Sequence, residues 1–285
     1  MSALLADVER RIGSVHQLDA VVNAMRGIAG ARAQQSRQIL PAIRTYAETA
    51  GRAIAQARRI HSAGPAMEDH RGAPGQPALV LFGAEQGFAG AYPERVLDAA
   101  AADFPDAHVF LIGARSAALA GERGLATAWQ ASLPGRVAAL PDVATLTLDA
   151  LYDYLAAAGA VPVTMIYPFW KAGEGLKIIR RPLLPLDSEA FPASGSGPVP
   201  LANMPPADLL AKLVQEYVFA QLCEAAAEAF AAENEARMAT MAAAKTHIDG
   251  KLAALQLEER LTRQSEITAE VVELAAGARF RAKQR

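Results

Sequence analysis

Apolar residues near the start of the chain fall on one face of a helix. They recur every three or four positions, at Val8, Ile12, Val15, Leu18, Val22, Met25 and Ala29. This spacing is typical of the narrow seam of a coiled coil. Strong helix formers continue to about Ile60, so residues 1–60 are predicted to form one helix, in which residues 4–60 would span about 85 Å. Pro41 lacks an amide proton, and a kink is expected there.

A second long helix is predicted at the other end of the chain, over residues 205–285. No proline follows Pro206, and Gly250 and Gly277 are the only glycines after it. Apolar positions form another narrow stripe, made of Met238, Met241, Ile248, Leu252 and Leu255. Unbroken, residues 205–281 would extend about 115 Å. Two such stripes are buried most economically if the two helices pair antiparallel with each other.

Between the two helices the pattern changes to short apolar runs that alternate with helical segments. Strands are expected at residues 78–82, 108–112, 161–167 and 176–179, and helices at residues 94–102, 114–123 and 141–158. This alternation is typical of an α/β domain with a largely parallel sheet, here over residues 77–186. Proline and glycine in residues 61–76 and 187–205 indicate a linker on each side.

The predicted fold class is therefore α+β overall. A long antiparallel coiled coil of the amino- and carboxyl-terminal helices carries a central, Rossmann-like α/β domain, which we expect at one end of the helix pair.

Charge is distributed unevenly along a chain whose net charge is −2. Residues 1–60 carry nine basic and four acidic side chains, a net charge of +5, whereas residues 61–204 carry −5 and residues 205–285 carry −2. A basic helix on a near-neutral protein favours an acidic partner surface, and an ordinary solvated face is the equally open alternative. The overall balance gives no reason to expect nucleic acid as a partner.

Motifs for catalysis or cofactor binding are absent from the sequence. The loop at residues 83–90 follows the first strand but matches neither G-x-G-x-x-G nor G-x-x-x-x-G-K-[ST], which favours turn glycines over a nucleotide site. A lone cysteine, Cys223, excludes an internal disulfide and a Cys-based zinc site, and a packed thiol is favoured over a nucleophile. The histidines lack metal-ligand spacing; they are His16, His61, His70, His108 and His247.

The chain also lacks the pattern of a signal peptide and any long uncharged apolar stretch. A soluble, cytoplasmic protein is expected, and any association with a membrane would go through a partner.

Two sets of residues, one at each end of the chain, carry a resemblance to a known family. The amino-terminal set is Arg11-Ile12, Ser14-Val15, Ala24-Met25 and Tyr46-Ala47-Glu48-Thr49. The carboxyl-terminal set is Glu235-Ala236-Arg237-Met238, Met241, Ala244, Leu255-Gln256-Leu257, Arg263-Gln264, Ile267-Thr268, Glu270, Glu273 and Gly277-Ala278. In this order the residues resemble the gamma subunit of rotary F-type ATP synthases. Gln86-Gly87-Phe88-Ala89-Gly90 also sits where that family has a glycine-rich turn.

The resemblance implies a non-catalytic central-stalk rotor with no cofactor and no metal. In this family the paired terminal helices sit inside a ring of alternating alpha and beta subunits. The α/β domain docks with the epsilon subunit on the membrane-embedded ring of c subunits. Rotation drives the beta-subunit catalytic sites through their binding states, which couples ion flow to ATP synthesis or hydrolysis. The implied location is peripheral, on the cytoplasmic face of the bacterial inner membrane.

The resemblance also implies a set of partner contacts. Arg263 and Gln264 would hydrogen-bond a loop of a beta subunit, and Met25 and Arg26 would lie opposite them on the amino-terminal helix.

Some residues depart from the usual pattern of the family, namely the run at residues 16–23, Glu259-Arg260 and Pro41. These departures indicate a divergent branch, such as the alternate bacterial complexes that translocate sodium. Ion selectivity resides in the c ring, so the sequence leaves both protons and sodium open. Two other functions stay as alternatives: a free coiled-coil adaptor bearing an α/β domain, and a small-molecule enzyme, which the missing motifs disfavour.

Overall fold

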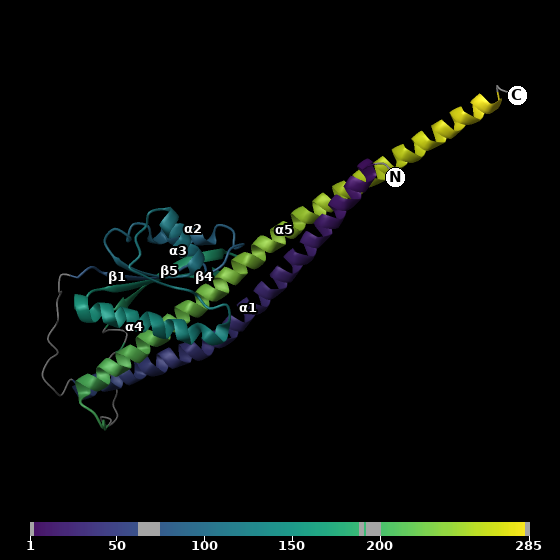
Figure 1. Cartoon of the computed structure of the whole chain (residues 1–285). Helices are drawn as coiled ribbons and strands as arrows, with labels where there is room; N and C mark the ends of the chain where they lie inside the picture. Colours follow the sequence, from purple (N-terminus) through teal and green to yellow (C-terminus); the bar gives the residue numbers. More distant parts are fainter. Residues whose placement is uncertain (1–2, 62–74, 188–190, 192–200, 283–285) are drawn as a thin grey trace. The chain divides into compact units, whose positions relative to one another are not determined.

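The computed structural model describes residues 3–61, 75–187, 191 and 201–282, and it contains two long helices and a five-stranded sheet (Figure 1). The elements are α1 (Ala3–His61), β1 (Ala78–Phe82), α2 (Tyr92–Ala100), β2 (His108–Ile112), α3 (Ala114–Glu122), β3 (Trp129–Ala131), the 3-10 turn η1 (Val137–Ala139), α4 (Leu140–Ala158), β4 (Val163–Lys171), β5 (Gly175–Leu184) and α5 (Pro206–Ala282). Long terminal helices around a central mixed sheet confirm the predicted α+β class.

The chain divides into two compact units. One, the terminal unit, contains Met1–Ile28 and Met238–Arg285; the other, the sheet unit, contains Ala29–Arg237. Both α1 and α5 contribute to each unit.

Within the terminal unit, α1 and α5 run antiparallel and side by side (Figure 1). Ion pairs fix the register: Asp19 Oδ1 lies 2.9 Å from Lys245 Nζ, and Glu9 Oε1 lies 3.4 Å from Arg263 Nη2. The apolar seam consists of Val22, Met241 and Ile248, with Val15, Met25, Ala244 and Leu252 packed around them. The predicted antiparallel pairing is confirmed in this unit.

The prediction that Leu18 belongs to the seam is wrong. Leu18 is 52% exposed, and the neighbouring Asp19 occupies the seam position, four residues after Val15 and three before Val22. A carboxylate can stand there because Lys245 of α5 pairs with it. The sequence prediction selected the apolar residue, whereas the helix geometry placed a partly buried ion pair at the seam.

Antiparallel pairing of α1 and α5 also holds within the sheet unit. The Ser36 hydroxyl donates to the carbonyl oxygen of Ala227 at 2.7 Å, and Arg44 contacts Glu224 and Glu228. α1 continues through Pro41 as a single helix, and the carbonyl oxygen of Pro41 accepts a bond from Thr45 Oγ1. The predicted kink at Pro41 stays a prediction.

The sheet has the strand order β3-β2-β1-β4-β5. The first four are parallel and β5 runs antiparallel to β4, so the predicted largely parallel sheet is confirmed. Strand β3 was not predicted, because it has only three residues and none of them is buried. Every residue of β1 is buried, as expected for a central strand covered on both faces.

Alternate residues of β1 face two apolar cores. Val80 and Phe82 pack with residues of α4 and with Leu222 of α5, whereas Leu79 and Leu81 pack with residues of α2 and α3. Residues of α5 enter both cores. Every residue from Ala220 to Arg237 is buried, so this stretch of α5 is enclosed on all sides.

The two predicted linkers fall largely outside the described residues, including Gly64, Pro65, Gly72, Pro74, Pro192, Gly195, Gly197, Pro198 and Pro200. Phe191 is described, and its ring packs edge-on against Tyr217 at a centroid distance of 5.1 Å. A Cβ atom at Gly51 would lie 2.9 Å from that ring, so the absence of a side chain on α1 makes room for it.

Candidate functional site

The loop at residues 83–91 follows β1, the strand at which the strand order of the sheet reverses. From β1 the chain passes to β2 and β3 on one side, and α4 then returns it to β4 on the other side of β1. In open α/β sheets the crevice at such a point, beyond the carboxyl ends of the strands, is where ligands bind. In this chain, side chains of the loop and of α5 lie in that region.

The first residues of the loop are held against β2 and α3. The Gly83 amide donates to the carbonyl oxygen of Ile112, and the Ala84 amide donates to Ser116 Oγ, at 2.7 and 2.8 Å. A Cβ atom at Gly83 would lie 2.4 Å from the Cβ atom of Ser116, so only glycine fits this approach. The favoured turn role of these glycines therefore has a steric reason.

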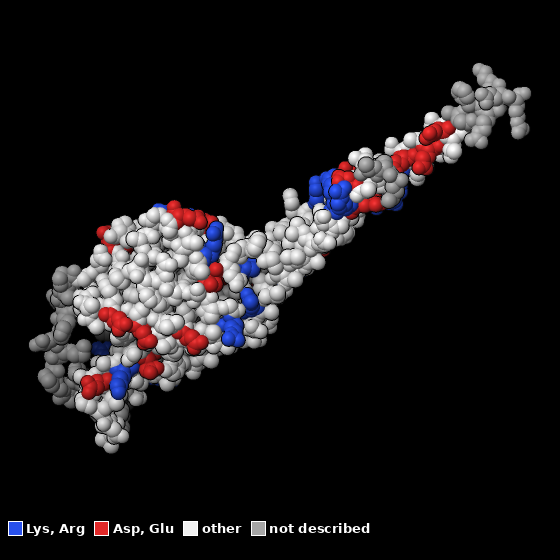
Figure 2. Space-filling model, in the orientation of Figure 1, with Lys and Arg blue, Asp and Glu red and all other residues white. Residues whose placement is uncertain are grey.

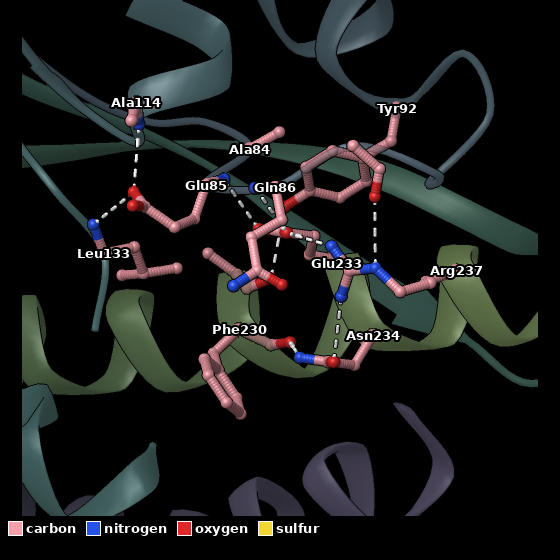
Figure 3. A network of polar contacts seen from close by, with 12 residues as sticks. Ala84, Glu85, Gln86, Tyr92, Ala114, Leu133, Phe230, Glu233, Asn234 and Arg237 are labelled. Atoms are coloured by element: carbon pink, nitrogen blue, oxygen red, sulfur yellow. Dashed lines mark hydrogen bonds and ion pairs between the residues drawn. The ribbon is translucent and has the colours of Figure 1, made fainter. Parts of the chain in front are cut away.

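Glu85 extends from the loop after β1 to the amino terminus of α3, the helix that follows β2. Its Oε2 atom accepts bonds from the amide of Ala114, the first residue of α3, at 2.9 Å and from the amide of Leu133 at 2.7 Å (Figure 3). Helix amino termini favour negative charge. The chain thus satisfies this anion position with its own side chain.

Glu233 of α5 holds the same loop from the other side. Its carboxylate accepts bonds from the amides of Glu85 and Gln86 at 2.8 and 3.0 Å, and it pairs with Arg237 at 2.5 Å (Figure 3). Glu233 is 3% exposed and Arg237 is 6% exposed. A buried carboxylate is tolerable here because a cation and two amide protons surround it.

Arg237 extends this network to the loop and along α5. Its Nε atom donates to the carbonyl oxygen of Gly87 at 3.1 Å, and its Nη1 atom donates to Asn234 Oδ1 at 3.0 Å. Tyr92, at the start of α2, donates its hydroxyl to the carbonyl oxygen of Ala229 at 3.1 Å. Burial, followed by the charge of Glu233, raises the pKa of Tyr92 well above its ordinary value, so the hydroxyl keeps its proton.

The tip of this fixed loop presents Phe88. Its side chain is 68% exposed, and its backbone φ of +62° lies in the left-handed region that bulky residues rarely adopt. A single exposed apolar side chain does not by itself define an interface. The sequence marked Gln86-Gly87-Phe88-Ala89-Gly90 as a motif but did not single out Phe88 as a contact.

The four predicted contact residues all lie in the terminal unit. Arg263 is exposed and pairs with Glu259 at 2.7 Å and with Glu9 at 3.4 Å. Gln264 and Arg26 are exposed, and Met25 is half-buried against the seam. Figure 2 shows acidic and basic side chains gathered together where the amino-terminal end of α1 lies beside α5.

The structure corrects the predicted arrangement of these four residues. Arg263 lies beside Glu9 of α1, whereas Met25 packs with Met241 and Ile248 of α5, so the pairs 25–26 and 263–264 are not opposite each other. The 16 residues from Glu9 to Met25 correspond to about 24 Å of helix. Pattern alone could not fix the register between the helices.

Sequence reasoning missed an exposed apolar stripe near the end of α5. Its members are Leu257, Leu261, Ile267, Val271, Val272 and Leu274, each more than half exposed. Isolated apolar residues on a surface are ordinary, but a run of them along one helix favours a protein interface. The spacing could have revealed the stripe, had the predicted seam been extended past Leu255.

Several other candidate sites can be described briefly. Burial raises the pKa of Cys223 to about 12, which keeps its thiol protonated and unreactive. Among the described residues, no group of three or more His, Cys, Asp and Glu side chains is placed to hold a metal ion. No helix in the described part of the chain is long and apolar enough to span a membrane.

Comparisons with known proteins give a consistent picture. A family model described as ATP synthase matches residues 4–279. The ATP synthase gamma chain of Geotalea uraniireducens (strain Rf4) is 23% identical over 285 residues, covering 97% of this chain and 98% of the relative. The ATP synthase gamma chain of Hyphomonas neptunium (strain ATCC 15444) is 27% identical over 292 residues, covering 96% and 98%.

Solved structures share the fold. The rotor of the Euglena gracilis mitochondrial ATP synthase aligns with a TM-score of 0.64 at 12% identity, covering 92% of this chain and 98% of that one. The central stalk and c ring of the Tetrahymena thermophila mitochondrial ATP synthase provide a second match, with a TM-score of 0.55 at 15% identity, covering 79% and 99%.

Proposed function

The chain belongs to the ATP synthase family as a gamma-type, non-catalytic subunit of the central stalk, and from that premise we propose how its surfaces serve the role. The paired ends of the chain turn inside a ring of alternating alpha and beta subunits. This rotation couples ion flow through the membrane-embedded ring of c subunits to ATP synthesis or hydrolysis in the alpha and beta subunits.

One observation carries this proposal: the terminal unit exposes an apolar stripe on α5 between Leu257 and Leu274. A helix pair buries its seam internally and has no need for apolar residues on its outer faces. A surrounding sleeve of partner subunits would cover the stripe. Its apolar character suits a shaft that must turn, because apolar contact is non-directional and does not lock one orientation.

The asymmetry of the helix pair explains how a non-catalytic part can drive catalysis. Each beta subunit would meet a different face of α1 and α5, and each face would favour a different state of its catalytic site. A shaft can shift such an equilibrium only through the difference in its contact energy with the two states.

We propose Met25, Arg26, Arg263 and Gln264 as contacts on this shaft, at two separate levels along the helix pair. Arg26 and Gln264 are exposed, and Arg263 keeps more than half of its side chain exposed while it pairs with Glu259. Guanidinium and amide groups can hydrogen-bond carboxylates and backbone carbonyls of a partner loop. The net charge of +5 over residues 1–60 suits acidic partner loops.

The three proposed working parts are residues 1–60 and 205–285, which form the shaft, and residues 77–186, which dock on the epsilon subunit and the c-subunit ring. The site of action would be the cytoplasmic face of the bacterial inner membrane, reached only through those partners. The departures at residues 16–23 support a divergent branch, and dependence of ion pumping on sodium would test that placement.

Copurification tests the proposal directly. A tagged chain, expressed with its neighbouring subunits, should recover three alpha and three beta subunits for each copy of itself. Recovery only as a homodimer without those subunits would contradict the proposal and favour a free adaptor.

A further inference from the structure

A single carboxylate joins three elements of the sheet unit. Glu224 of α5 is 8% exposed. Its Oε1 atom accepts a bond from Arg44 Nε of α1 at 2.9 Å, and its Oε2 atom accepts one from Arg181 Nη1 of β5 at 3.1 Å. The two oxygens therefore tie α5 to the other long helix and to the edge strand of the sheet.

Neighbouring groups complete this joint. Arg44 Nη2 also donates to Glu228 Oε1 at 2.7 Å, and Arg181 Nη1 also donates to Gln221 Oε1 at 2.6 Å. Glu224, Glu228, Arg44 and Arg181 balance in charge. The guanidinium of Arg181 also lies over the ring of Tyr167 on β4, 5.4 Å from its centroid.

Part of the apolar packing beside this joint is made of small side chains. Between Glu224 and Phe230 the buried apolar residues of α5 are all alanines, at positions 225, 226, 227 and 229. Small, smooth side chains make close contact but interdigitate little, and apolar contact has no preferred direction. Charge-assisted hydrogen bonds from two sides are directional, and they hold only in one register.

We propose that Glu224, Arg44 and Arg181 are positioning residues that lock the sheet to the helix pair in one rotational register, so that torque passes between them without slip. The inference rests on the proposed function, because only a rotating stalk places such a load on this joint. Buried ion pairs add little net stability, and setting a unique arrangement is their best-supported use. The joint should therefore affect the efficiency of coupling more than the stability of the fold.

The experiment compares R181M, E224Q and the double variant in the complete ATP synthase, reconstituted in sealed membrane vesicles. For each complex the rate of ATP-driven ion pumping is divided by the rate of ATP hydrolysis. We expect R181M and E224Q each to lower this ratio by roughly twofold or more at high opposing ion gradient. The double variant should be no worse than E224Q alone, because both substitutions remove the ion pair between Glu224 and Arg181.

Arg180 provides a matched control, since it is the adjacent arginine of the same strand and pairs with Asp103 rather than with a long helix. R180M should leave the ratio unchanged. Urea unfolding of each full-length chain reports any loss of folding separately. If E224Q fails to assemble, the result for R181M alone tests the inference. The side chain of Arg181 is 37% exposed, so its replacement is the milder change.

An unchanged ratio in assembled R181M would overturn the inference, as would an equal fall in R180M. Failure of the unmodified chain to join alpha and beta subunits would instead count against the proposed function. The two failures are therefore distinguishable.

Discussion

The helix α5 is used in two different ways along its length. In the sheet unit, every residue from Ala220 to Arg237 is buried, and seven of them are polar or charged: Gln221, Glu224, Glu228, Glu233, Asn234, Glu235 and Arg237. In the terminal unit, from residue 239 to residue 275, only Met241, Ile248 and Leu255 are buried, at every seventh position. The first stretch is buried and includes several buried polar side chains, whereas the second is mostly exposed and buries only a narrow apolar seam.

The difference shows what each stretch is built to do. Buried charges paired with neighbouring elements fix one arrangement, because each unpaired group would be costly. A narrow seam with exposed sides holds two helices together and leaves their outer faces for partners. We infer that rigidity is concentrated in the sheet unit and that contact surface is concentrated in the terminal unit.

The largest effect should come from breaking the enclosed stretch. Glu233→Ala leaves the buried guanidinium of Arg237 without its carboxylate partner and two loop amides without their acceptor, and we expect the free energy of unfolding to fall by about 3–5 kcal/mol. Urea unfolding of the full chain measures this. Glu258→Ala removes a half-exposed partner of Arg11 and should cost about 0.5 kcal/mol or less. Equal losses of stability in Glu233→Ala and Glu258→Ala would show that the buried and exposed stretches of α5 do not differ in rigidity.

A charge in the thin seam should have the next largest effect. Met241 is 4% exposed, and Met241→Asp places a carboxylate among the apolar residues of the seam, at an expected cost of about 3 kcal/mol. Thermal melting gives the measurement. Leu18→Asp serves as the control, because Leu18 is 52% exposed and its replacement should change stability by about 0.5 kcal/mol or less. A melt of Met241→Asp that matched the parent would mean that the seam lies elsewhere.

A smaller effect is expected at the loop that Glu233 and Arg237 hold. Phe88 has a φ of +62°, which glycine adopts without strain and alanine does not. Phe88→Gly should therefore be more stable than Phe88→Ala by about 1 kcal/mol in urea unfolding. The opposite order would show that the loop relaxes out of this conformation when the ring is removed.

The smallest effect on stability should come from Arg263→Ala in the exposed stretch. Arg263 is exposed, so the free energy of unfolding should change by about 0.5 kcal/mol or less. ATP synthesis in membranes should nevertheless fall, because a partner contact is lost. Lys251→Ala, on the same helix and also exposed, controls for loss of a cation. Unchanged synthesis would remove Arg263 from the contact surface.

The sequence predicted the parts of the fold that depend on local pattern. The spacing of apolar residues identified both long helices, a proline-free run supported the second of them, and buried apolar runs identified β1 and β2. It missed what depends on pairing over long distances. Asp19 entered the seam only because Lys245 lies across from it, and Glu233 is buried only because the loop after β1 supplies two amides. The register between the two helices depends on such pairs rather than on periodicity. The positions of Met25 and Arg263 along the helix pair depend on them in the same way.

The carboxylate of Glu85 occupies the amide of Ala114 at the first turn of α3. Because Glu85 belongs to the same polypeptide, its effective concentration at that helix end far exceeds that of a dissolved anion. Anions in solution would therefore compete poorly for this amide, and we expect the chain's own side chain to keep it occupied.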